Sequence, residues 1–306
     1  MVDVAEAALQ RGSSLEQVLN DVRDSGDCQT LDYDALLNTD VDRATISPPV
    51  NHADEHRILI TGTGLTHTGG MKSRDQMHGD GAASENDSVR MFQMGVEGGK
   101  PEPGHRGAAP EWFYKGDGFN LRGRGQTLEI PRFTTDGGEE PEIAVVYLID
   151  EERTPRRLGF CLGNEWSDHP LEKINYLYLA PSKLRTCALG PELITDLDFA
   201  EVELNCRVMR GDEILYDSGP LLSGEDHMCH SLANCEDHHF KYAQHRRPGD
   251  VHIHFLGTSK LSYGQRDWTY EDGDVITIRS PQMGASLVNP VARRIPDDRP
   301  VTVRKL

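Results

Sequence analysis

Short apolar runs separated by glycine and proline dominate the chain from residue 57 onward. The runs are rich in Val, Ile, Leu and aromatic residues, a composition typical of β-strands. The expected strands are RILITGTG (57–64), EWFYKG (111–116), EIAVVYLI (142–149), RLGFCLGN (157–164), FAEVELNCRVMR (199–210), DEILYDS (212–218), DVHIHFLGT (250–258) and DVITIRS (274–280). Their irregular spacing predicts a mixed, largely antiparallel β-structure with few helices.

The first 50 residues have a different, helical and polar pattern. In SSLEQVLNDVR, Ser14 fits an N-cap and Glu16 a first-turn acid, whereas SPPVNHAD cannot continue a helix. We therefore expect a helical N-terminal segment, residues 1–50, that packs against the main domain, residues 51–306, or contacts a second subunit. Two further helices are expected, over residues 88–98 and 224–244.

Composition and charge narrow the class of protein. The 306 residues are 37% hydrophobic and 27% charged, as in ordinary soluble proteins, and the net charge of −18 repels nucleic acid and anionic lipid. No apolar run approaches the length of about 20 residues that a membrane helix needs, and the N-terminus lacks a signal-peptide pattern. The six cysteines include no CxxC pair, which favours reduced thiols. We expect a cytoplasmic protein that binds neither nucleic acid nor membranes.

Two glutamates stand at the start of the apolar strand in GGEEPEIAVVYLI. Side chains alternate along a strand, so Glu140 and Glu142 project to one side roughly 7 Å apart, while Ile143 and Val145 face the core. Like charges this close favour a divalent cation or a shared proton, and oxygen ligands favour Mg²⁺, Mn²⁺ or Ca²⁺ over zinc. By itself, the pair is a weak signal, because an isolated E-x-E at the start of a strand is more often two solvated glutamates.

Further candidate residues follow along the chain. GFCLGNEWSDH (159–169) offers Glu165 or Asp168 as a third carboxylate, and SKLRTCALGPE offers Lys183 as a base or an anion-binding ammonium. Each could also be an ordinary loop or surface residue.

The expected helix over residues 224–244 carries several histidines. His227 and His230 would share a face, and His238 and His239 follow, but no HExxH pattern is present. We expect contacts at the helix surface, between subunits or at the outer wall of a pocket, rather than a zinc site.

The order of these motifs resembles the fumarylacetoacetate hydrolase superfamily over residues 57–295. The motifs are TGTGLTH (61–67), PEWFYKG (110–116), EEPEIAVV (139–146), GFCLGNEWS (159–167), SKLRTCALGP (182–191), RPGDVHIHFLGT (247–258) and EDGDVITIRSPQMGASLVNPV (271–291). Each motif alone is nonspecific, but all seven occur in order. The chain is most similar to the bacterial branch that contains 2-keto-3-deoxy sugar acid (arabinonate) dehydratases.

This resemblance implies an α+β, mainly β fold with a distorted β-roll core, a Mg²⁺-type metal, a small-molecule 2-keto acid substrate and a homodimer. Members hold the metal with an E-x-E pair and an Asp, for which this chain has Glu. The residues implied are Glu140, Glu142 and Glu165 as metal ligands, Lys183 and His67 as catalytic residues, and Lys115, Gly257 and Thr258 around the substrate.

The resemblance covers two reactions through a metal-stabilised enolate: dehydration of a 2-keto-3-deoxy sugar acid, and hydrolysis of the C–C bond of a 2,4-diketo acid. Hydrolases of the superfamily activate water with a His and a Glu three residues later, but Gly70 follows His67 at that spacing. Hydrolysis would need a substitute base such as His78 or Glu85, whereas dehydration can use Lys183. The sequence favours a dehydratase (a hydro-lyase), ahead of a hydrolase, an aldol-cleaving enzyme and a non-catalytic sugar-acid-binding protein.

Overall fold

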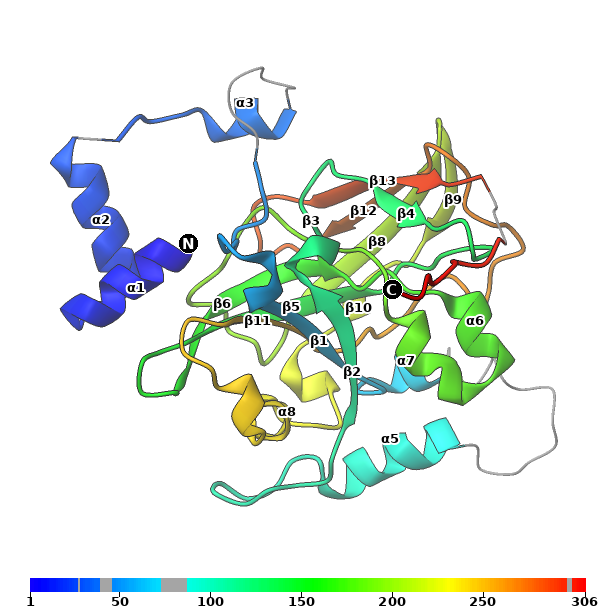
Figure 1. The fold of residues 1–306 in the computed structure, drawn as a ribbon, viewed down its shortest axis with the longest axis horizontal. Coiled ribbons are helices and arrows are strands. Elements are labelled where there is room, and N and C mark those ends of the chain that lie inside the picture. The colour runs from blue at the N-terminus through cyan, green and yellow to red at the C-terminus, as the bar shows by residue number, and fades with distance from the viewer. Residues whose placement is uncertain (27, 39–45, 73–86, 296–298) are drawn as a thin grey trace.

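The structure, a computed structural model, describes residues 1–26, 28–38, 46–72, 87–295 and 299–306. Two β-sheets form its body, and most helices lie around them (Figure 1). The expected mainly β, α+β fold is confirmed, and each of the strands expected from the apolar runs lies within or overlaps an observed strand. None of the described helices combines the length and the apolar character needed to cross a membrane.

The larger sheet has seven strands in the order β2-β1-β11-β5-β6-β7-β3. Neighbouring strands run antiparallel except in two pairs, β1 with β11 and β3 with β7. The strands are β1 (Ile58–Gly64), β2 (Glu111–Asp117), β3 (Leu121–Arg122), β5 (Pro141–Ile149), β6 (Pro155–Asn164), β7 (Cys187–Leu189) and β11 (Val251–Phe255).

The smaller sheet has six strands, in the order β10-β8-β12-β13-β4 with β9 paired to β8. Only its β13–β4 pair is parallel. The strands are β4 (Leu128–Ile130), β8 (Glu203–Arg210), β9 (Glu213–Asp217), β10 (Leu221–Leu222), β12 (Val275–Arg279) and β13 (Leu287–Arg293). The expected mixed, largely antiparallel pairing is confirmed in both sheets.

Strand β5 is buried along its whole length and contributes to two apolar clusters. Ile143 and Val145 lie in the cluster shared with β6, β8, β12 and β13, between the two sheets. Ala144 and Val146, on the opposite face, pack in the cluster with β1 and β11. Both faces of the strand are therefore held, which fixes the position of the residues at its N-terminal end.

The helices are short. They are α1 (Val2–Arg11), α2 (Leu15–Ser25), α3 (Tyr33–Asn38), α5 (Asp87–Gly98), α6 (His169–Ile174), α7 (Leu179–Ser182) and α8 (Leu232–Phe240), with 3-10 turns η1 (Glu55–Arg57), η2 (Gly118–Asn120), η3 (Tyr176–Tyr178), η4 (Glu225–His227) and η5 (Ala243–His245). Ser14 caps α2 as expected, accepting a hydrogen bond from the Gln17 amide, and α5 matches the helix expected over 88–98. Val2 and Ala5 of α1 pack on the outer face of the larger sheet. The domain division near residue 50 stays a prediction.

The single helix expected over residues 224–244 is wrong. Met228 is extended and forms a bridge with His67, and Ser231 then starts a new helix, α8, by accepting a hydrogen bond from the Asn234 amide. The segment thus contains a 3-10 turn, η4, followed by a separate capped helix, α8, in place of one long helix. His227 and His230 therefore do not share a helical face.

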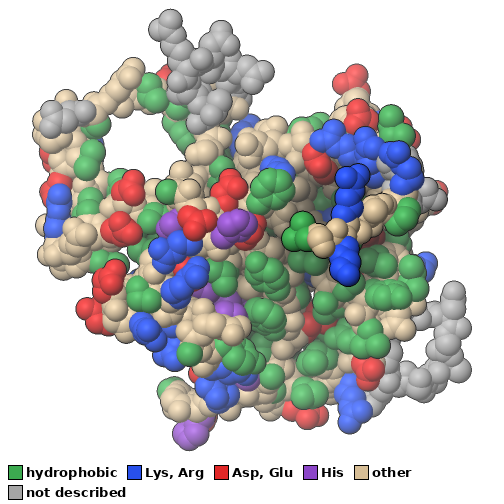
Figure 2. Space-filling view, in the orientation of Figure 1, with side chains coloured by type: hydrophobic (Ala, Val, Ile, Leu, Met, Phe, Trp, Pro, Cys, Tyr) green, Lys and Arg blue, Asp and Glu red, His purple; other side chains and the backbone are tan. Residues whose placement is uncertain are grey.

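Hydrophobic side chains gather on the face of the molecule around α6 and α7 (Figure 2). Ile174, Leu177 and Leu184 are exposed in this region. The homodimer implied by the resemblance stays a prediction.

Candidate metal centre

Three glutamates meet where β5 begins and β6 ends. Glu140 directly precedes β5, Glu142 lies within it, and Glu165 directly follows β6. These two strands are antiparallel, with Pro141 opposite Asn164, and the Glu165 amide donates a hydrogen bond of 3.0 Å to the Glu140 carbonyl. Strand pairing therefore brings together carboxylates that are more than 20 residues apart in sequence.

The carboxylate oxygens of Glu140, Glu142 and Glu165 include one from each residue that lie within 4.8 Å of one another. All three side chains are buried, with 5%, 1% and 0% of the residue exposed. Of the described residues, no other group of three or more His, Cys, Asp or Glu is placed to hold a metal ion. The triad expected from the sequence is thus brought together by the fold.

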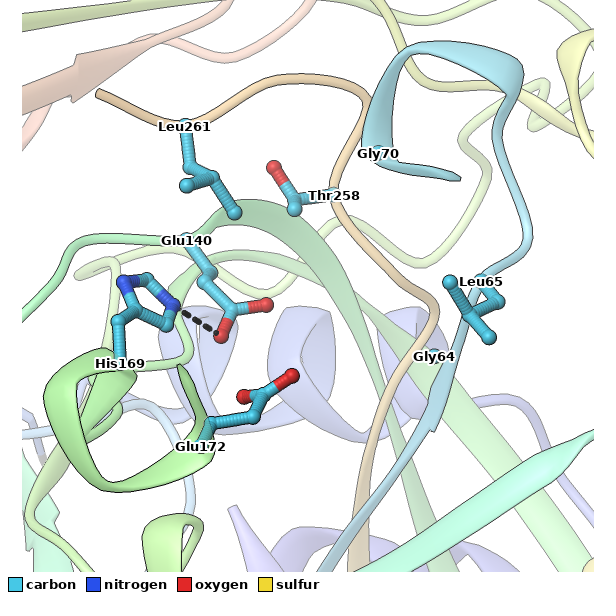
Figure 3. Close-up of a pocket in the computed structure, with 8 residues that line it drawn as sticks. All are labelled: Gly64, Leu65, Gly70, Glu140, His169, Glu172, Thr258 and Leu261. Atoms are coloured by element: carbon cyan, nitrogen blue, oxygen red, sulfur yellow. Dashed lines mark hydrogen bonds and ion pairs between the residues drawn. The ribbon is translucent and has the colours of Figure 1, made fainter. Parts of the chain in front are cut away.

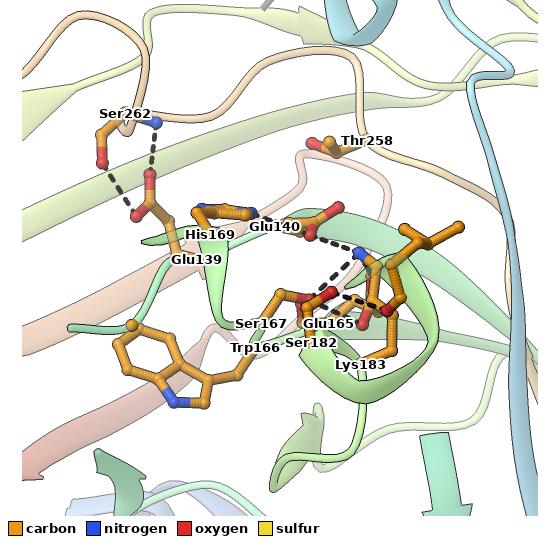
Figure 4. Close-up of polar contacts among 12 residues, drawn as sticks. Glu139, Glu140, Glu165, Trp166, Ser167, His169, Ser182, Lys183, Thr258 and Ser262 are labelled. Atoms are coloured by element: carbon orange, nitrogen blue, oxygen red, sulfur yellow. Dashed lines mark hydrogen bonds and ion pairs between the residues drawn. The ribbon is translucent and has the colours of Figure 1, made fainter. Parts of the chain in front are cut away.

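A lysine ammonium bridges two members of this triad. Lys183 Nζ donates to Glu140 Oε1 at 2.6 Å, to Glu165 Oε2 at 2.5 Å and to Ser167 Oγ at 3.1 Å (Figure 4). Lys183 follows the short helix α7 and is 1% exposed. The expected active-site lysine is therefore in direct contact with the candidate ligands.

A second buried lysine reaches the triad from β2. Lys115 Nζ lies 2.6 Å from Glu165 Oε1 and 3.1 Å from the Lys183 carbonyl, and it also donates to the Trp166 carbonyl. It ties the segment that carries Glu165 to the one that carries Lys183. Contact of Lys115 with a substrate stays a prediction.

The electrostatics of the triad are unbalanced. Burial, and then the charges of Glu165 and Glu140, raise the pKa of Glu142 well above its usual value. Burial, and then the charge of Glu140, also raise the pKa of Glu165. Burial alone would raise the pKa of Glu140, but Lys183 and His169 outweigh it and hold that pKa well below the usual value. Two ammonium groups thus face three carboxyl groups, and without a cation a proton balances the excess.

These residues fit a hard divalent cation. The ligands are all oxygens, they converge in a buried space, and their excess negative charge is what a cation would neutralise. The triad could therefore hold a metal ion, and its donor set favours Mg²⁺, Mn²⁺ or Ca²⁺.

A small cavity of about 20 Å³ adjoins Glu140 (Figure 3). Its walls are Gly64, Leu65, Gly70, Glu140, His169, Glu172, Thr258 and Leu261. This volume is enough for a water or a single ion. A sugar acid of five carbons is several times larger, so substrate binding would have to move part of the wall.

His169 and Glu172, on α6, were missed by the sequence analysis. His169 Nε2 lies 3.0 Å from Glu140 Oε1, and both side chains are buried. A Cβ at Gly138 would collide with Nδ1 of His169, so this glycine permits the close approach of the imidazole. The signal available in the sequence was DHPLE, in which an N-cap Asp and a Pro start a helix and place His and Glu three residues apart.

Asp168, the other carboxylate considered as a third ligand, is not part of the triad. Its Oδ1 accepts the Leu171 amide at 3.1 Å and caps α6, while its Oδ2 pairs with Arg185 and accepts the Thr134 hydroxyl at 2.6 Å. Its contacts are those of a residue that positions a helix.

Gly257 and Thr258 follow β11 beside the triad. The Gly257 amide donates to Glu142 Oε2 at 2.7 Å, and the Thr258 hydroxyl donates to the Pro141 carbonyl at 3.1 Å. Gly257 has a φ of 92°, and a Cβ there would collide with the Thr66 hydroxyl, so glycine is required. Thr258 lines the cavity, and contact of either residue with substrate stays a prediction.

His67 lies apart from these contacts. Its Nδ1 is 2.8 Å from the Thr66 hydroxyl, its backbone pairs with Met228, and burial lowers its pKa to about 4. Within the described residues, no hydrogen bond or ion pair joins His67 to the triad. The two substitute bases considered, His78 and Glu85, lie outside the described residues.

His239 of α8 belongs to a separate buried cluster, whereas the neighbouring His238 contacts the Gly107 carbonyl at 3.1 Å and the Lys241 ammonium at 2.8 Å. His239 Nε2 is 2.8 Å from His252 Nδ1, and its ring lies 4.9 Å from that of His254. His254 in turn contacts the hydroxyls of Thr61 and Thr63 at 2.8 and 2.7 Å. The cluster joins α8 to β1 and β11 by ring packing and hydrogen bonds.

Glu139 faces away from the triad and anchors the chain that follows Thr258. Its carboxylate accepts hydrogen bonds from the Ser262 amide at 2.7 Å, the Ser262 hydroxyl at 2.9 Å and the Tyr270 hydroxyl at 2.6 Å (Figure 4). Ser262 follows Leu261, a wall residue of the cavity. Glu139 therefore anchors the loop on one side of the chain, and the adjacent Glu140 belongs to the triad on the other side.

Comparison with solved structures shows a fold of the fumarylacetoacetate hydrolase type. A structure of 2-keto-3-deoxy-D-arabinonate dehydratase complexed with magnesium and 2,5-dioxopentanoate matches with a TM-score of 0.67 and 20% identity, over 87% of this chain and 83% of that chain. The 5-carboxymethyl-2-hydroxymuconate delta-isomerase from Mycobacterium smegmatis matches with a TM-score of 0.52 and 19% identity, over 81% and 82% of the respective chains. No family model and no curated protein matches the chain. The resemblance predicted from the motifs is thus confirmed for the fold.

Proposed function

We propose that the protein is a metal-dependent dehydratase of a 2-keto-3-deoxy sugar acid of the pentonate type. The observation that carries the proposal is the buried triad of Glu140, Glu142 and Glu165 in contact with Lys183. A similar fold in a magnesium-bound 2-keto-3-deoxy-D-arabinonate dehydratase supports the choice of substrate class.

The three glutamates would hold the cation, and a divalent cation there would supply a Lewis acid for the keto and carboxylate oxygens of the acid. The other steps fall to side chains of the chain itself. The Thr258 hydroxyl, at the cavity wall, would donate to the substrate carboxylate. Lys115 would hold Glu165 in place through its 2.6 Å ion pair.

Lys183 would take the proton from C3. In the structure its Nζ donates to three oxygens, so it must give up contacts before it can accept a proton. With a cation bound, Glu140 and Glu165 would stabilise the charged ammonium of Lys183 less strongly. The free energy needed to convert that ammonium to the neutral amine would therefore be lower. The lysine that neutralises the triad thus becomes the base when the site is loaded.

Hydrolysis of a 2,4-diketo acid remains the alternative, and it requires a base that activates water. His67 makes its described contacts with Thr66, the Ser223 backbone and Met228, not with the triad. Dehydration uses residues already in contact and is therefore preferred. The homodimer and the cytoplasmic location stay predictions.

Two measurements test the proposal. Protein supplied with Mg²⁺ or Mn²⁺ should exchange the methyl protons of pyruvate with deuterated water, because the enolate forms without a leaving group. A 2-keto-3-deoxypentonate should give 2,5-dioxopentanoate, and a 2,4-diketo acid should give no pyruvate. The control is Glu192→Gln, whose carboxylate pairs with the Tyr33 hydroxyl and the Gly284 amide, contacts outside the candidate centre. Failure of metal-loaded protein to exchange pyruvate protons would refute the enzyme proposal, and pyruvate from the diketo acid would favour the hydrolase.

A further inference from the structure

We propose that Leu65 is a specificity-determining residue, whose side chain limits the length of the 2-keto acid at the centre and favours five-carbon over six-carbon acids. The proposal rests on the proposed dehydratase function and deepens it, since it concerns the choice of substrate. The supporting feature is a leucine held in a left-handed backbone conformation at the wall of the cavity beside Glu140.

The backbone of Leu65 is strained. Leu65 directly follows β1 and has a φ of 52°, a region that residues with a Cβ disfavour. Of the described residues with positive φ, eleven are glycines, and the other two are Leu65 and Arg153. Arg153 lies in the exposed turn between β5 and β6, whereas Leu65 is buried. Glycine would avoid the cost of this conformation, and strain of this kind is concentrated at functional sites.

The chain around Leu65 is held on both sides. Before it, β1 is paired along both edges, with β2 and β11. After it, the Cys229 amide donates to the Thr66 carbonyl at 2.7 Å, and the Thr66 hydroxyl donates to the Leu256 carbonyl at 2.8 Å. The Cys229 thiol donates to the carbonyl of Leu65 itself at 3.4 Å. These contacts fix Leu65 as a part of the wall that cannot easily recede.

The side chain of Leu65 belongs to the cavity rather than to the core. Leu65 lies on the opposite side of the cavity from His169, and Leu261 forms another part of the wall (Figure 3). Within the described part of the chain, both leucines are buried, yet neither is a member of the two apolar clusters that form the core. The wall therefore presents fixed apolar surface to whatever enters.

This surface lies where the carbon chain of a substrate would extend. An acid bound at the triad through its carboxylate and keto oxygens would direct its remaining carbons into the cavity that adjoins Glu140. The cavity has a volume of about 20 Å³, so each additional carbon has to be accommodated against the wall. A further carbon with its hydroxyl would meet the leucine side chain and lose hydration without gaining a hydrogen bond. Volume and polarity both disfavour the longer acid.

The test compares Leu65→Ala and Leu65→Gly with the wild-type protein and with Arg153→Gly. Both Leu65 variants remove the branched end of the side chain. We expect kcat/KM for a 2-keto-3-deoxyhexonate, relative to that for the 2-keto-3-deoxypentonate, to rise by about 10-fold or more in both. Arg153→Gly relieves the same kind of backbone strain at the other end of β5, away from the cavity, and should keep the wild-type ratio.

Urea unfolding tests the backbone conformation independently of activity. Leu65→Gly should have a higher urea midpoint than Leu65→Ala, because glycine is the less strained residue at a φ of 52°. Equal or reversed midpoints would overturn the proposal, since the leucine would then not be held in a costly conformation.

The kinetic outcomes separate specificity from support of the centre. An unchanged substrate ratio in both Leu65 variants, or a wild-type preference for the hexonate, would overturn the proposal. Loss of Mn²⁺ binding and of pyruvate proton exchange in both variants would also overturn it, by assigning Leu65 to the support of the metal site. If the wild-type protein neither exchanges pyruvate protons nor dehydrates the pentonate, the proposed function itself is refuted.

Discussion

Glu142→Gln should separate the stability of the protein from its affinity for metal. Burial and two neighbouring carboxylates raise the pKa of Glu142 well above its usual value, so without metal the substitution removes a group that already favours its protonated form. Glutamine has the shape of that form, and its oxygen can still accept the Gly257 amide, now 2.7 Å from Glu142 Oε2. The free energy of unfolding of the metal-free protein should change by about 1 kcal/mol or less.

With metal, the same substitution removes one of three charged ligands. Two unit charges about 4 Å apart interact by about 4 kcal/mol at an effective dielectric constant near 20, which corresponds to about 1,000-fold in affinity. Calorimetric titration with Mn²⁺ gives the dissociation constant directly. Thermal unfolding gives a second readout, because metal at about 100 times the wild-type dissociation constant should stabilise that protein by about 2.7 kcal/mol, or about 4 °C for a chain of this length, and leave the variant nearly unchanged.

The matched control is Glu139→Gln, at an equally buried neighbouring position. Glu139 accepts three hydrogen bonds, from Ser262 and Tyr270, and makes none with the triad, so this variant should lose stability but keep its thermal response to metal. An unchanged Mn²⁺ affinity in Glu142→Gln would remove Glu142 from the site. A large loss of stability in its metal-free form would refute the electrostatic reasoning.

Three further perturbations follow from the contacts described. Lys183→Met removes the ammonium shared by the buried carboxylates of Glu140 and Glu165, of which Glu165 keeps its ion pair with Lys115, so the metal-free protein should lose about 3–5 kcal/mol and Mg²⁺ should restore part of it in thermal unfolding; no response to Mg²⁺ would contradict this. Tyr270→Phe removes a hydrogen bond to the Glu139 carboxylate, and urea unfolding should show a loss of about 1.5–3 kcal/mol, whereas a neutral result would assign the bond no net value. Burial lowers the pKa of His252 and of His254 to about 3, so the stability that depends on their neutral form is complete above pH 6.5 and is lost as the pH falls toward 3. Between pH 7 and pH 5, each of these two histidines should lower the free energy of unfolding by about 2 kcal/mol, and equal urea midpoints at the two pH values would refute this.

The strands and the glutamate triad could be predicted from the sequence because both depend on local alternation. Strand β5 is an apolar run, and the two-residue period that sends Ile143 to the core sends Glu140 and Glu142 to one side. Glu165 could be placed near them because it ends the next strand, and successive strands are commonly paired.

The rest of the site depends on packing that no local pattern contains. Helix α6 has only six residues, too few to show a period, and its position over the cavity is set by contacts such as that of Asp168 with Arg185. The interruption between η4 and α8 arises from the pairing of Met228 with His67, residues far apart in the sequence. The sequence therefore showed His169 and Glu172 at a helical spacing, but it could not predict that both residues line a cavity.

The placement of Glu139 and Glu140 on opposite sides limits how this segment can vary in length. An insertion or deletion of one residue just before β5 would exchange the two faces of the chain. Glu139, which anchors the loop, would then face the metal triad, and Glu140 would face Ser262. A substitution within the triad keeps this register, whereas a change of length can be accommodated in the turn after Ile149, before β6 begins at Pro155. A substitution can therefore change a ligand in this segment, but a change in the length of the segment would disrupt both the loop anchor at Glu139 and the metal triad.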